Sequence, residues 1–123
     1  MILGVGCDIL EVARMEKSVQ RESYREKVFT PVEIVYCEGK GAHCLESYAA
    51  RFAGKEAVAK ALGEGFRQGV LQEISISNDD LGHPQVQLSG YFKTLAEKKG
   101  VKHIHISLSH CKDSAIAQVI LEG

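Results

Sequence analysis

Four charged side chains recur at short spacings in RFAGKEAVAKALGEGF, residues 51–66, a segment otherwise rich in alanine. On a helix, at about 100° per residue, Glu56 and Lys60 lie about 40° apart among apolar positions, whereas Arg51 and Lys55 fall nearly opposite. Charges among apolar positions are costly to bury unless they are paired or bind a ligand. Two interpretations stay open: an i,i+4 ion pair with snorkelling neighbours, or a site that binds a cation and an anion.

A further carboxylate, Asp8, lies in the N-terminal segment MILGVGCDILEV, which is typical of a buried strand. Alternation places Asp8 on the face of Gly4 and Gly6, and the opposite face is wholly apolar: Leu3, Val5, Cys7 and Ile9. The glycines leave room for something to approach the backbone closely. Asp8 either caps a neighbouring helix or converges with Glu56 on one hard cation, since two carboxylates with phosphate oxygens and water suit Mg²⁺. Lys60 would then contact the same phosphates, so that a diphosphate substrate would connect all three charges.

Histidine, serine and cysteine offer weaker candidates for chemistry. His110, at the end of a strand, is either a satisfied loop histidine or a donor to a phosphate or nucleobase. Ser107 and Ser109 lack the surroundings of a nucleophile, which argues against serine hydrolysis. The four cysteines form no C-x-x-C pair and are expected to be reduced, with Cys7 and Cys111 in the core. The spacing of the remaining candidates fits no structural zinc pattern: His43, Cys44, His103 and His105.

The elements that must position these side chains include both helices and strands. Helices are expected over residues 14–25, from the Thr30, Pro31 and Glu33 capping pattern to before residue 39, over residues 44–62, and from Ser89 to residue 99. Strands are expected over residues 1–12, in a hairpin of EISISND with PQVQL, and on both sides of a turn at residues 110–113. Glycines at 63 and 65 end the long helix. Hairpins and strands at both ends indicate an α+β fold with a largely antiparallel sheet packed with helices.

Composition limits the class of function. With 123 residues and 13.5 kDa, the chain fits one domain over residues 1–123, with little core to spare for a deep enclosed site, so a site shared between subunits is compatible with its size. The 15 basic and 16 acidic residues form no run that is typical of nucleic-acid binding. The apolar start lacks a basic flank and is broken by Asp8, so neither a signal peptide nor a membrane span is predicted. A cytoplasmic protein is expected.

Five segments, in this order, carry a resemblance over nearly the whole chain: GVGCDILEVARM, FTPVE, RFAGKEAVAKALGEGF, GHP and HISLSHCKDSAIAQVI. Together they resemble the 4′-phosphopantetheinyl transferases, specifically the short, single-domain holo-[acyl carrier protein] synthase type. The resemblance implies transfer of the phosphopantetheine arm of coenzyme A to a serine of an apo acyl carrier protein, which releases adenosine 3′,5′-bisphosphate. Fatty acid biosynthesis is the implied setting.

The resemblance also implies roles for individual residues. Asp8 and Glu56 match the family's Mg²⁺ ligands, and with Lys60 they match its catalytic residues. The implied coenzyme A contacts are Arg51, Lys60, Gly63, Pro84 and His110. The implied contacts to the acidic carrier protein are Arg14, Arg21 and Arg25. The short type typically assembles as a homotrimer with the site between subunits.

Several alternatives stay open from the residues. The base that activates the carrier serine is either Glu56 or a metal-bound water oriented by Asp8, because both need only hydrogen-bond reach. Lys55 is left to contact coenzyme A, a neighbouring subunit or water. A non-catalytic module that binds carrier protein or nucleotide and a Mg²⁺-dependent nucleotide pyrophosphohydrolase are the competing functions.

Overall fold

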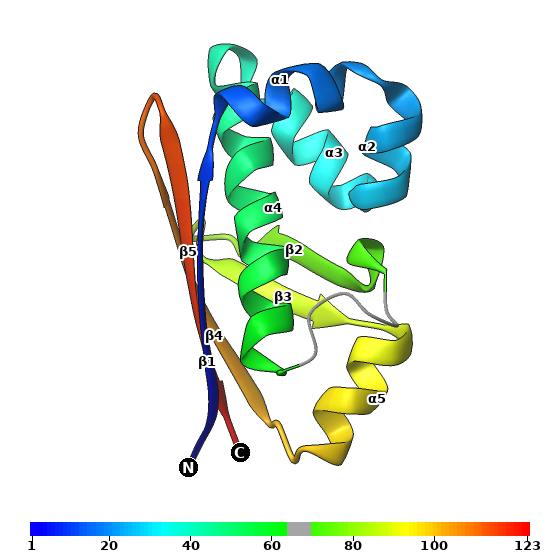
Figure 1. Cartoon of the computed structure of the whole chain (residues 1–123), viewed down its shortest axis with the longest axis vertical. Coiled ribbons are helices and arrows are strands. Elements are labelled where there is room, and N and C mark those ends of the chain that lie inside the picture. Colours follow the sequence, from blue (N-terminus) through cyan, green and yellow to red (C-terminus); the bar gives the residue numbers. More distant parts are fainter. Residues whose placement is uncertain (64–69) are drawn as a thin grey trace.

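The computed structural model describes residues 1–63 and 70–123, in which helices and strands pack around one long central helix (Figure 1). The strand pairings of the described residues are antiparallel, which confirms the predicted α+β class. The elements in chain order are β1 (Ile2–Glu11), α1 (Ala13–Gln20), α2 (Glu22–Val28), α3 (Pro31–Glu38), α4 (Cys44–Ala61), β2 (Ile74–Asn78), β3 (Pro84–Leu88), α5 (Gly90–Lys98), β4 (His103–His110) and β5 (Ser114–Glu122), with short 3-10 turns at Gly41–His43 and Leu71–Glu73.

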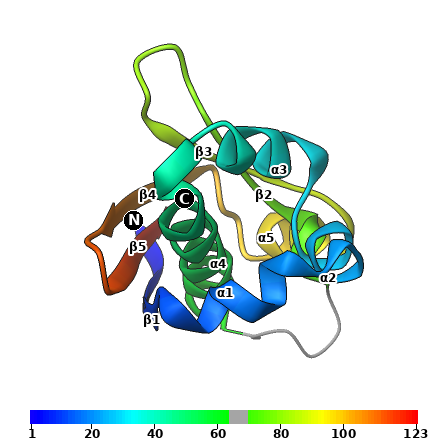
Figure 2. The same cartoon turned by 90° about the horizontal axis from the view of Figure 1, so that it is seen from above.

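Helix α4 lies against a three-stranded sheet with the order β1-β5-β4, and the β2–β3 hairpin forms a second, two-stranded sheet. Viewed from above, α4 is surrounded by the sheet on one side and by the other helices and the hairpin on the rest (Figure 2). A side chain in place of Gly4 or Gly6 would collide with the backbone of α4 at Ala61 or Ala57. The close approach that the glycines of β1 predict is therefore made by α4 itself.

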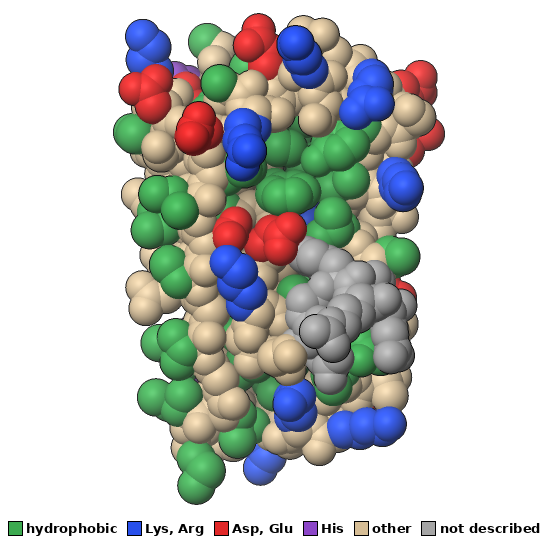
Figure 3. Space-filling view, in the orientation of Figure 1, with side chains coloured by type: hydrophobic (Ala, Val, Ile, Leu, Met, Phe, Trp, Pro, Cys, Tyr) green, Lys and Arg blue, Asp and Glu red, His purple; other side chains and the backbone are tan. Residues whose placement is uncertain are grey.

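The apolar face of β1 points away from this core, and the prediction that it is buried is wrong for the single chain. Val5 is 58% exposed and Ile9 is 68% exposed, and Leu3 and Cys7 are exposed as well. Ile116 of the neighbouring strand β5 adds a further exposed side chain. Figure 3 shows hydrophobic side chains spaced down the edge of the molecule on which Figure 1 draws these strands. On the face of β1 that packs against α4 there is room only for small residues such as Gly4 and Gly6, so the large apolar side chains lie on the outer face.

The segment 14–25 is not one helix. Its backbone turns to an extended conformation at Arg21 (φ −88°, ψ 119°), which ends α1 and begins α2. Arg14 therefore lies on α1 and Arg25 on α2, although the sequence predicts one helix for both. Helices α1, α2 and α3 lie together at one end of the molecule (Figure 1). There Val19 and Phe29 bury their side chains in a cluster with Tyr48 of α4.

The predicted helix boundaries agree with the structure in most places. At α3, the Thr30 hydroxyl accepts from the Glu33 backbone N–H and the Glu33 carboxylate accepts from the Thr30 N–H, as the capping pattern predicts. Gly63 follows α4 with a φ of +84°, a conformation that favours glycine; the other predicted glycine of this helix end, at position 65, lies outside the described residues. Ser89 precedes α5 without a side-chain cap bond. Within residues 1–63 and 70–123, no helix is long and apolar enough to cross a membrane.

Candidate active site

Asp8, Glu56 and Lys60 come together between β1 and α4, and we call these three residues the carboxylate cluster. The Lys60 ammonium donates to Asp8 Oδ1 at 2.8 Å and to the Cys7 carbonyl at 3.2 Å. Asp8 is held here because it lies on the inward face of β1, whose glycines allow α4 to approach. The cluster stays open to solvent, since the Lys60 side chain is 52% exposed.

The carboxylate cluster perturbs the protonation of its own members. Burial and the nearby charge of Asp8 raise the pKa of Glu56, and Lys60 partly opposes this shift. The hydrogen bond to Asp8 raises the pKa of Lys60. Two carboxylates that repel one another are stabilised by a shared cation, and Glu56 therefore lies in an environment that favours one.

The donor set of this cluster fits a hard divalent cation. In the described part of the chain, no three His, Cys, Asp or Glu side chains gather closely enough to form an all-protein metal site, and this includes the zinc candidates. Mg²⁺ seldom needs such a cage, because it retains several waters and is bound by one or two carboxylates with substrate phosphates. Asp8 and Glu56 are a pair of the kind that this ion uses.

A second candidate region is a pocket of about 170 Å³ between α3, α4 and the β2–β3 loop, which we call the arginine pocket. It brings together three of the predicted coenzyme-binding residues: Arg51, Pro84 and His110. Its other polar side chains are Tyr36, Ser47 and Asn78. None of these three residues was predicted from the sequence. They belong to different elements, and no sequence pattern connects them, so only the fold shows that they share a pocket.

Arg51 is 4% exposed and has an incomplete set of partners. Its guanidinium lies 4.1 Å from the centroid of the Tyr36 ring, and one terminal nitrogen donates to the Asn78 side-chain oxygen. Among the described residues its buried Nε finds no acceptor. A buried cation with an unused donor suits an anionic group chemically, because an unpaired buried donor is costly.

His110 lies at the rim of this pocket, where β4 ends. Its Nδ1 is 3.1 Å from Oε2 of Glu46, an oxygen that also lies 3.2 Å from Nδ1 of His43. The second ring nitrogen of His110 is therefore the one available to a ligand. Glu46 of α4 therefore orients the His110 ring at the end of β4.

The two regions use different faces of α4. The arginine pocket is lined by neither Asp8, Glu56 nor Lys60, and Arg51 and Lys60 differ by nine residues and by about half a turn of the helical wheel. Gly63 follows the C-terminal end of α4, the end at which Lys60 lies. The structure thus separates the predicted site residues into two sets within one chain.

The sequence-based view of burial on α4 was wrong in one respect. Glu56 and Lys60 were expected to be the inward pair, yet Arg51 and Lys55 are the buried ones, and Lys55 is fully buried. Lys55 therefore contacts neither solvent nor a surface ligand. The expectation of core packing for Cys7 and Cys111 is also wrong, because both thiols are exposed.

The predicted carrier-binding arginines differ in their surroundings. Arg14 is exposed on α1, and Arg21 is exposed with its guanidinium 5.8 Å from the Tyr24 ring. Arg25 is partly buried and donates to the Val19 carbonyl near the end of α1. Arg25 thus has a hydrogen bond to the backbone, whereas Arg21 has the contact with the Tyr24 ring.

Comparison with known proteins assigns a class to this arrangement. The model of the 4′-phosphopantetheinyl transferase superfamily matches residues 4–119. The chain therefore belongs to this superfamily, as its sequence motifs predicted. Within it, the chain groups with the holo-[acyl carrier protein] synthases: it is 44% identical over 126 residues to the one from Syntrophus aciditrophicus, covering 100% of this chain and 98% of that one.

Solved structures agree with this grouping. The holo-[acyl carrier protein] synthase of Neisseria meningitidis has a TM-score of 0.90 and 30% identity, with all of both chains covered. The holo-[acyl carrier protein] synthase of Bacillus anthracis, solved in complex with coenzyme A (3′,5′-ADP), has a TM-score of 0.83 and 37% identity and covers 100% of this chain and 98% of that chain. The predicted transferase fold is thereby confirmed.

Proposed function

We propose that this protein is a Mg²⁺-dependent holo-[acyl carrier protein] synthase that transfers 4′-phosphopantetheine from coenzyme A to a serine of apo acyl carrier protein. The observation that supports this most is the pairing of a carboxylate-lysine cluster with a separate pocket containing a buried, incompletely partnered arginine. The transfer breaks the diphosphate linkage of coenzyme A, which also carries a further phosphate on its nucleotide. Residues 1–123 form one transferase domain in this proposal.

The arginine pocket binds the nucleotide end of coenzyme A. Arg51 provides a fixed cation and an unused Nε donor, and His110 provides a ring nitrogen at the rim. Arginine is well suited to this role, because its planar donors match phosphate oxygens. The Bacillus anthracis relative, solved with coenzyme A (3′,5′-ADP), supports a ligand of this kind.

Asp8 and Glu56 hold Mg²⁺, which supplies charge neutralisation for the diphosphate when bound. Lys60 orients the same phosphate oxygens and stabilises the negative charge that develops on the leaving adenosine 3′,5′-bisphosphate. Glu56 accepts the proton of the carrier serine hydroxyl. Burial and Asp8 raise the pKa of Glu56 in the metal-free protein, and bound Mg²⁺ would oppose that shift, so the role of Glu56 as base rests on its place beside Asp8 and Lys60.

The complete site lies between two copies of the chain in a homotrimer. The carboxylate cluster and the arginine pocket lie on opposite faces of α4 and share no lining residue, so in this proposal each site combines the cluster of one copy with the pocket of a neighbouring copy. The exposed apolar face of β1 and β5 provides a surface that a second copy would cover, with Val5, Ile9 and Ile116 on it.

The carrier protein docks on α1 and α2. Residues 13–28 contain five Lys or Arg side chains and three Asp or Glu side chains, so their surface carries a net positive charge. Arg14 and Arg21 are exposed and able to meet an acidic partner, whereas Arg25 has the Val19 carbonyl as a structural contact. The four free cysteines support a reducing, cytoplasmic location.

The transfer reaction is tested by incubating the protein with apo carrier protein, coenzyme A and MgCl₂ and weighing the carrier by mass spectrometry. A gain of the phosphopantetheine mass, lost when Mg²⁺ is chelated, is expected. An unmodified carrier together with coenzyme A cleaved by water would instead indicate a pyrophosphohydrolase. Binding of carrier or nucleotide with neither product would indicate a non-catalytic module.

The shared site is tested by mixing two variants with different defects, assayed at a coenzyme A concentration near the wild-type KM, where each alone has little activity. Glu56→Gln damages only the carboxylate cluster and Arg51→Met damages only the arginine pocket, so a mixed trimer contains some interfaces with two intact halves. After co-refolding in equal amounts, recovery of up to about a quarter of wild-type activity is expected from random assembly. Activity no greater than the sum of the separate variants would place the whole site in one chain.

A further inference from the structure

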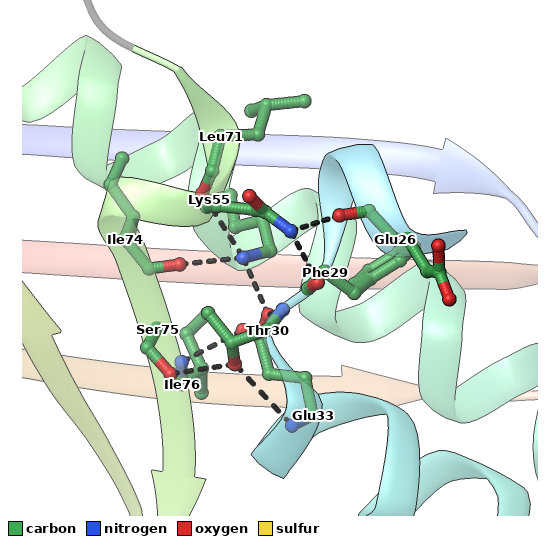
Figure 4. Close-up of polar contacts among 10 residues, drawn as sticks. Glu26, Phe29, Thr30, Glu33, Lys55, Leu71, Ile74, Ser75 and Ile76 are labelled. Atoms are coloured by element: carbon green, nitrogen blue, oxygen red, sulfur yellow. Dashed lines mark hydrogen bonds and ion pairs between the residues drawn. The ribbon is translucent and has the colours of Figure 1, made fainter. Parts of the chain in front are cut away.

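A lysine and a glutamate form a fully buried ion pair at the centre of the molecule (Figure 4). Lys55 Nζ lies 2.6 Å from Oε1 of Glu33. It also donates to the backbone carbonyls of Ile74 at 2.6 Å and Leu71 at 3.1 Å. An ammonium group has three protons, and here each has an acceptor.

Both oxygens of Glu33 also have partners. Its Oε1 also accepts from the Thr30 backbone N–H at 2.8 Å, and its Oε2 accepts from the Ile76 backbone N–H at 2.8 Å. The pair therefore connects α3, which carries Glu33, with α4, which carries Lys55, and with β2, which carries Ile76 (Figure 4). We call Lys55 and Glu33 the buried bridge.

The same three elements build the arginine pocket a short distance along each of them. Tyr36 is three residues after Glu33 on α3, Arg51 is four residues before Lys55 on α4, and Asn78 lies two residues after Ile76 on β2. One turn of helix or one strand repeat separates each bridge group from its pocket group. The cation–π contact with Tyr36 and the hydrogen bond to Asn78 are the contacts that orient Arg51.

Stability alone is a poor reason for such a pair. Removing two charges from water is costly, and well-packed apolar side chains often stabilise a core at least as well. Burial lowers the pKa of Lys55, and Glu33 opposes that shift. Hydrogen bonds are directional, whereas apolar surfaces can slide past one another. The bridge therefore fixes the relative position of the three elements that it connects, which apolar contacts would not do.

We propose that Lys55 and Glu33 are positioning residues for the binding of coenzyme A: the buried bridge sets the spacing of α3, α4 and β2 so that Arg51 is held between Tyr36 and Asn78. This inference rests on the proposed function of the arginine pocket. Neither bridge residue touches the ligand, because both are fully buried. The bridge has no direct contact with Asp8 or Lys60 among the interactions of the described residues.

The test uses Glu33→Gln and Lys55→Met in the full-length protein, with adenosine 3′,5′-bisphosphate as the probe in isothermal titration calorimetry. Glutamine has nearly the volume of glutamate, but its amide nitrogen would face a backbone N–H. Affinity for the nucleotide is expected to fall about tenfold or more in both variants, because a displaced arginine binds its ligand poorly. The KM for coenzyme A should rise correspondingly, while kcat at saturation stays within about threefold of wild type.

Phe92→Leu is the matched control. Phe92 is fully buried in α5, does not line the arginine pocket and forms no part of the buried bridge, so this variant measures the effect of lost core packing on nucleotide binding. It should bind the nucleotide as wild type does when each protein is measured well below its melting temperature. Glu33→Gln removes the charge of the bridge but keeps the size of the side chain, so it decides the question even where Lys55→Met does not fold.

Wild-type affinity in a folded bridge variant would overturn the inference, as would an equal loss in Phe92→Leu. A fall in kcat with unchanged KM would also overturn it, because the bridge would then act on the chemical step. Failure of the wild-type protein to bind the nucleotide would contradict the proposed function instead, so the two failures are distinguishable.

Discussion

In the carboxylate cluster the Lys60 side chain is 52% exposed and has one acidic partner, whereas in the arginine pocket Arg51 is 4% exposed and stacked on an aromatic ring. Both side chains come from the same helix, α4. The cluster is open, so a cation and phosphate oxygens can replace water there at little structural cost. In the pocket, Arg51 of α4 is already held by side chains of α3 and β2, a fixed arrangement of the kind that favours tight binding of one ligand group. The chain thus separates the region suited to changing charge from the region suited to recognition.

The largest effect is expected from Glu56→Gln, which tests whether the carboxylate cluster acts separately from the arginine pocket. Transfer to the carrier is expected to fall by about a thousandfold or more at any Mg²⁺ concentration, since a base and a metal ligand are lost together. Nucleotide affinity should stay unchanged, because Glu56 does not line the arginine pocket. Mass spectrometry of the carrier and calorimetry measure the two effects, with Glu97→Gln on the exposed side of α5 as the control. Near-normal transfer would remove Glu56 from both roles.

Two lysines of α4 allow a direct comparison of stability. Lys55→Met is expected to lower the free energy of unfolding by about 3–5 kcal/mol, because it leaves the Glu33 carboxylate buried without its cation. Lys60→Met should cost less than about 1 kcal/mol, since Lys60 is largely solvated, yet it should abolish most of the transfer activity. Urea unfolding followed by circular dichroism compares the two. Similar losses of stability would contradict the assignment of Lys55 to the core.

Arg51→Met tests the contribution of the arginine pocket to the binding of coenzyme A. The KM for coenzyme A is expected to rise about a hundredfold with little change in kcat, because a charge that contacts only the nucleotide end contributes to binding of substrate and transition state alike. Arg51→Lys, which keeps the charge but not the planar donors, should fall between this variant and wild type. Steady-state kinetics with varied coenzyme A provides the measurement. A loss confined to kcat would assign Arg51 to the chemistry.

A smaller effect is expected outside both regions, at α1. Arg14→Glu should weaken carrier binding about tenfold at low salt and less at high salt, since an exposed charge is screened. Affinity for coenzyme A should not change. Lys98→Glu makes the same charge change on exposed α5 and serves as the matched control. Equal losses in both variants would indicate a general charge effect instead of a docking surface.

The smallest predicted effect concerns the protonation of Glu56. In metal-free protein, carbon-13 NMR should give a Glu56 pKa above the ordinary 4.5, and Asp8→Asn should lower it because the repelling charge is gone. The folded protein holds this proton more tightly than the unfolded chain does, so the contribution of Glu56 to stability falls as the pH rises through the range between the two pKa values. Glu56→Gln should therefore melt slightly above wild type at neutral pH. The difference should vanish well below pH 4.5. A lower melting point at neutral pH would contradict this sign.

Local patterns predicted most of the fold. The Thr30 capping box, the end of α4 before Gly63, the β2–β3 hairpin and the C-terminal strands were all identified correctly, because short-range hydrogen bonds and backbone preferences decide them. The break at Arg21 was missed. No glycine or proline marks it, and α1 and α2 are instead held by packing against the rest of the protein.

For the candidate site, the chemistry could be predicted from the sequence: which carboxylates, lysine, arginine and histidine are available, and that Glu56 and Arg51 lie on different sides of one helix. Tertiary structure decided burial. Helical spacing sets the angle between side chains but says nothing of what packs against each side, so only the fold reveals that the core receives Arg51 and Lys55 while Lys60 faces solvent. The partner of Lys55 is Glu33, 22 positions away in the chain, and no local spacing predicts that pair.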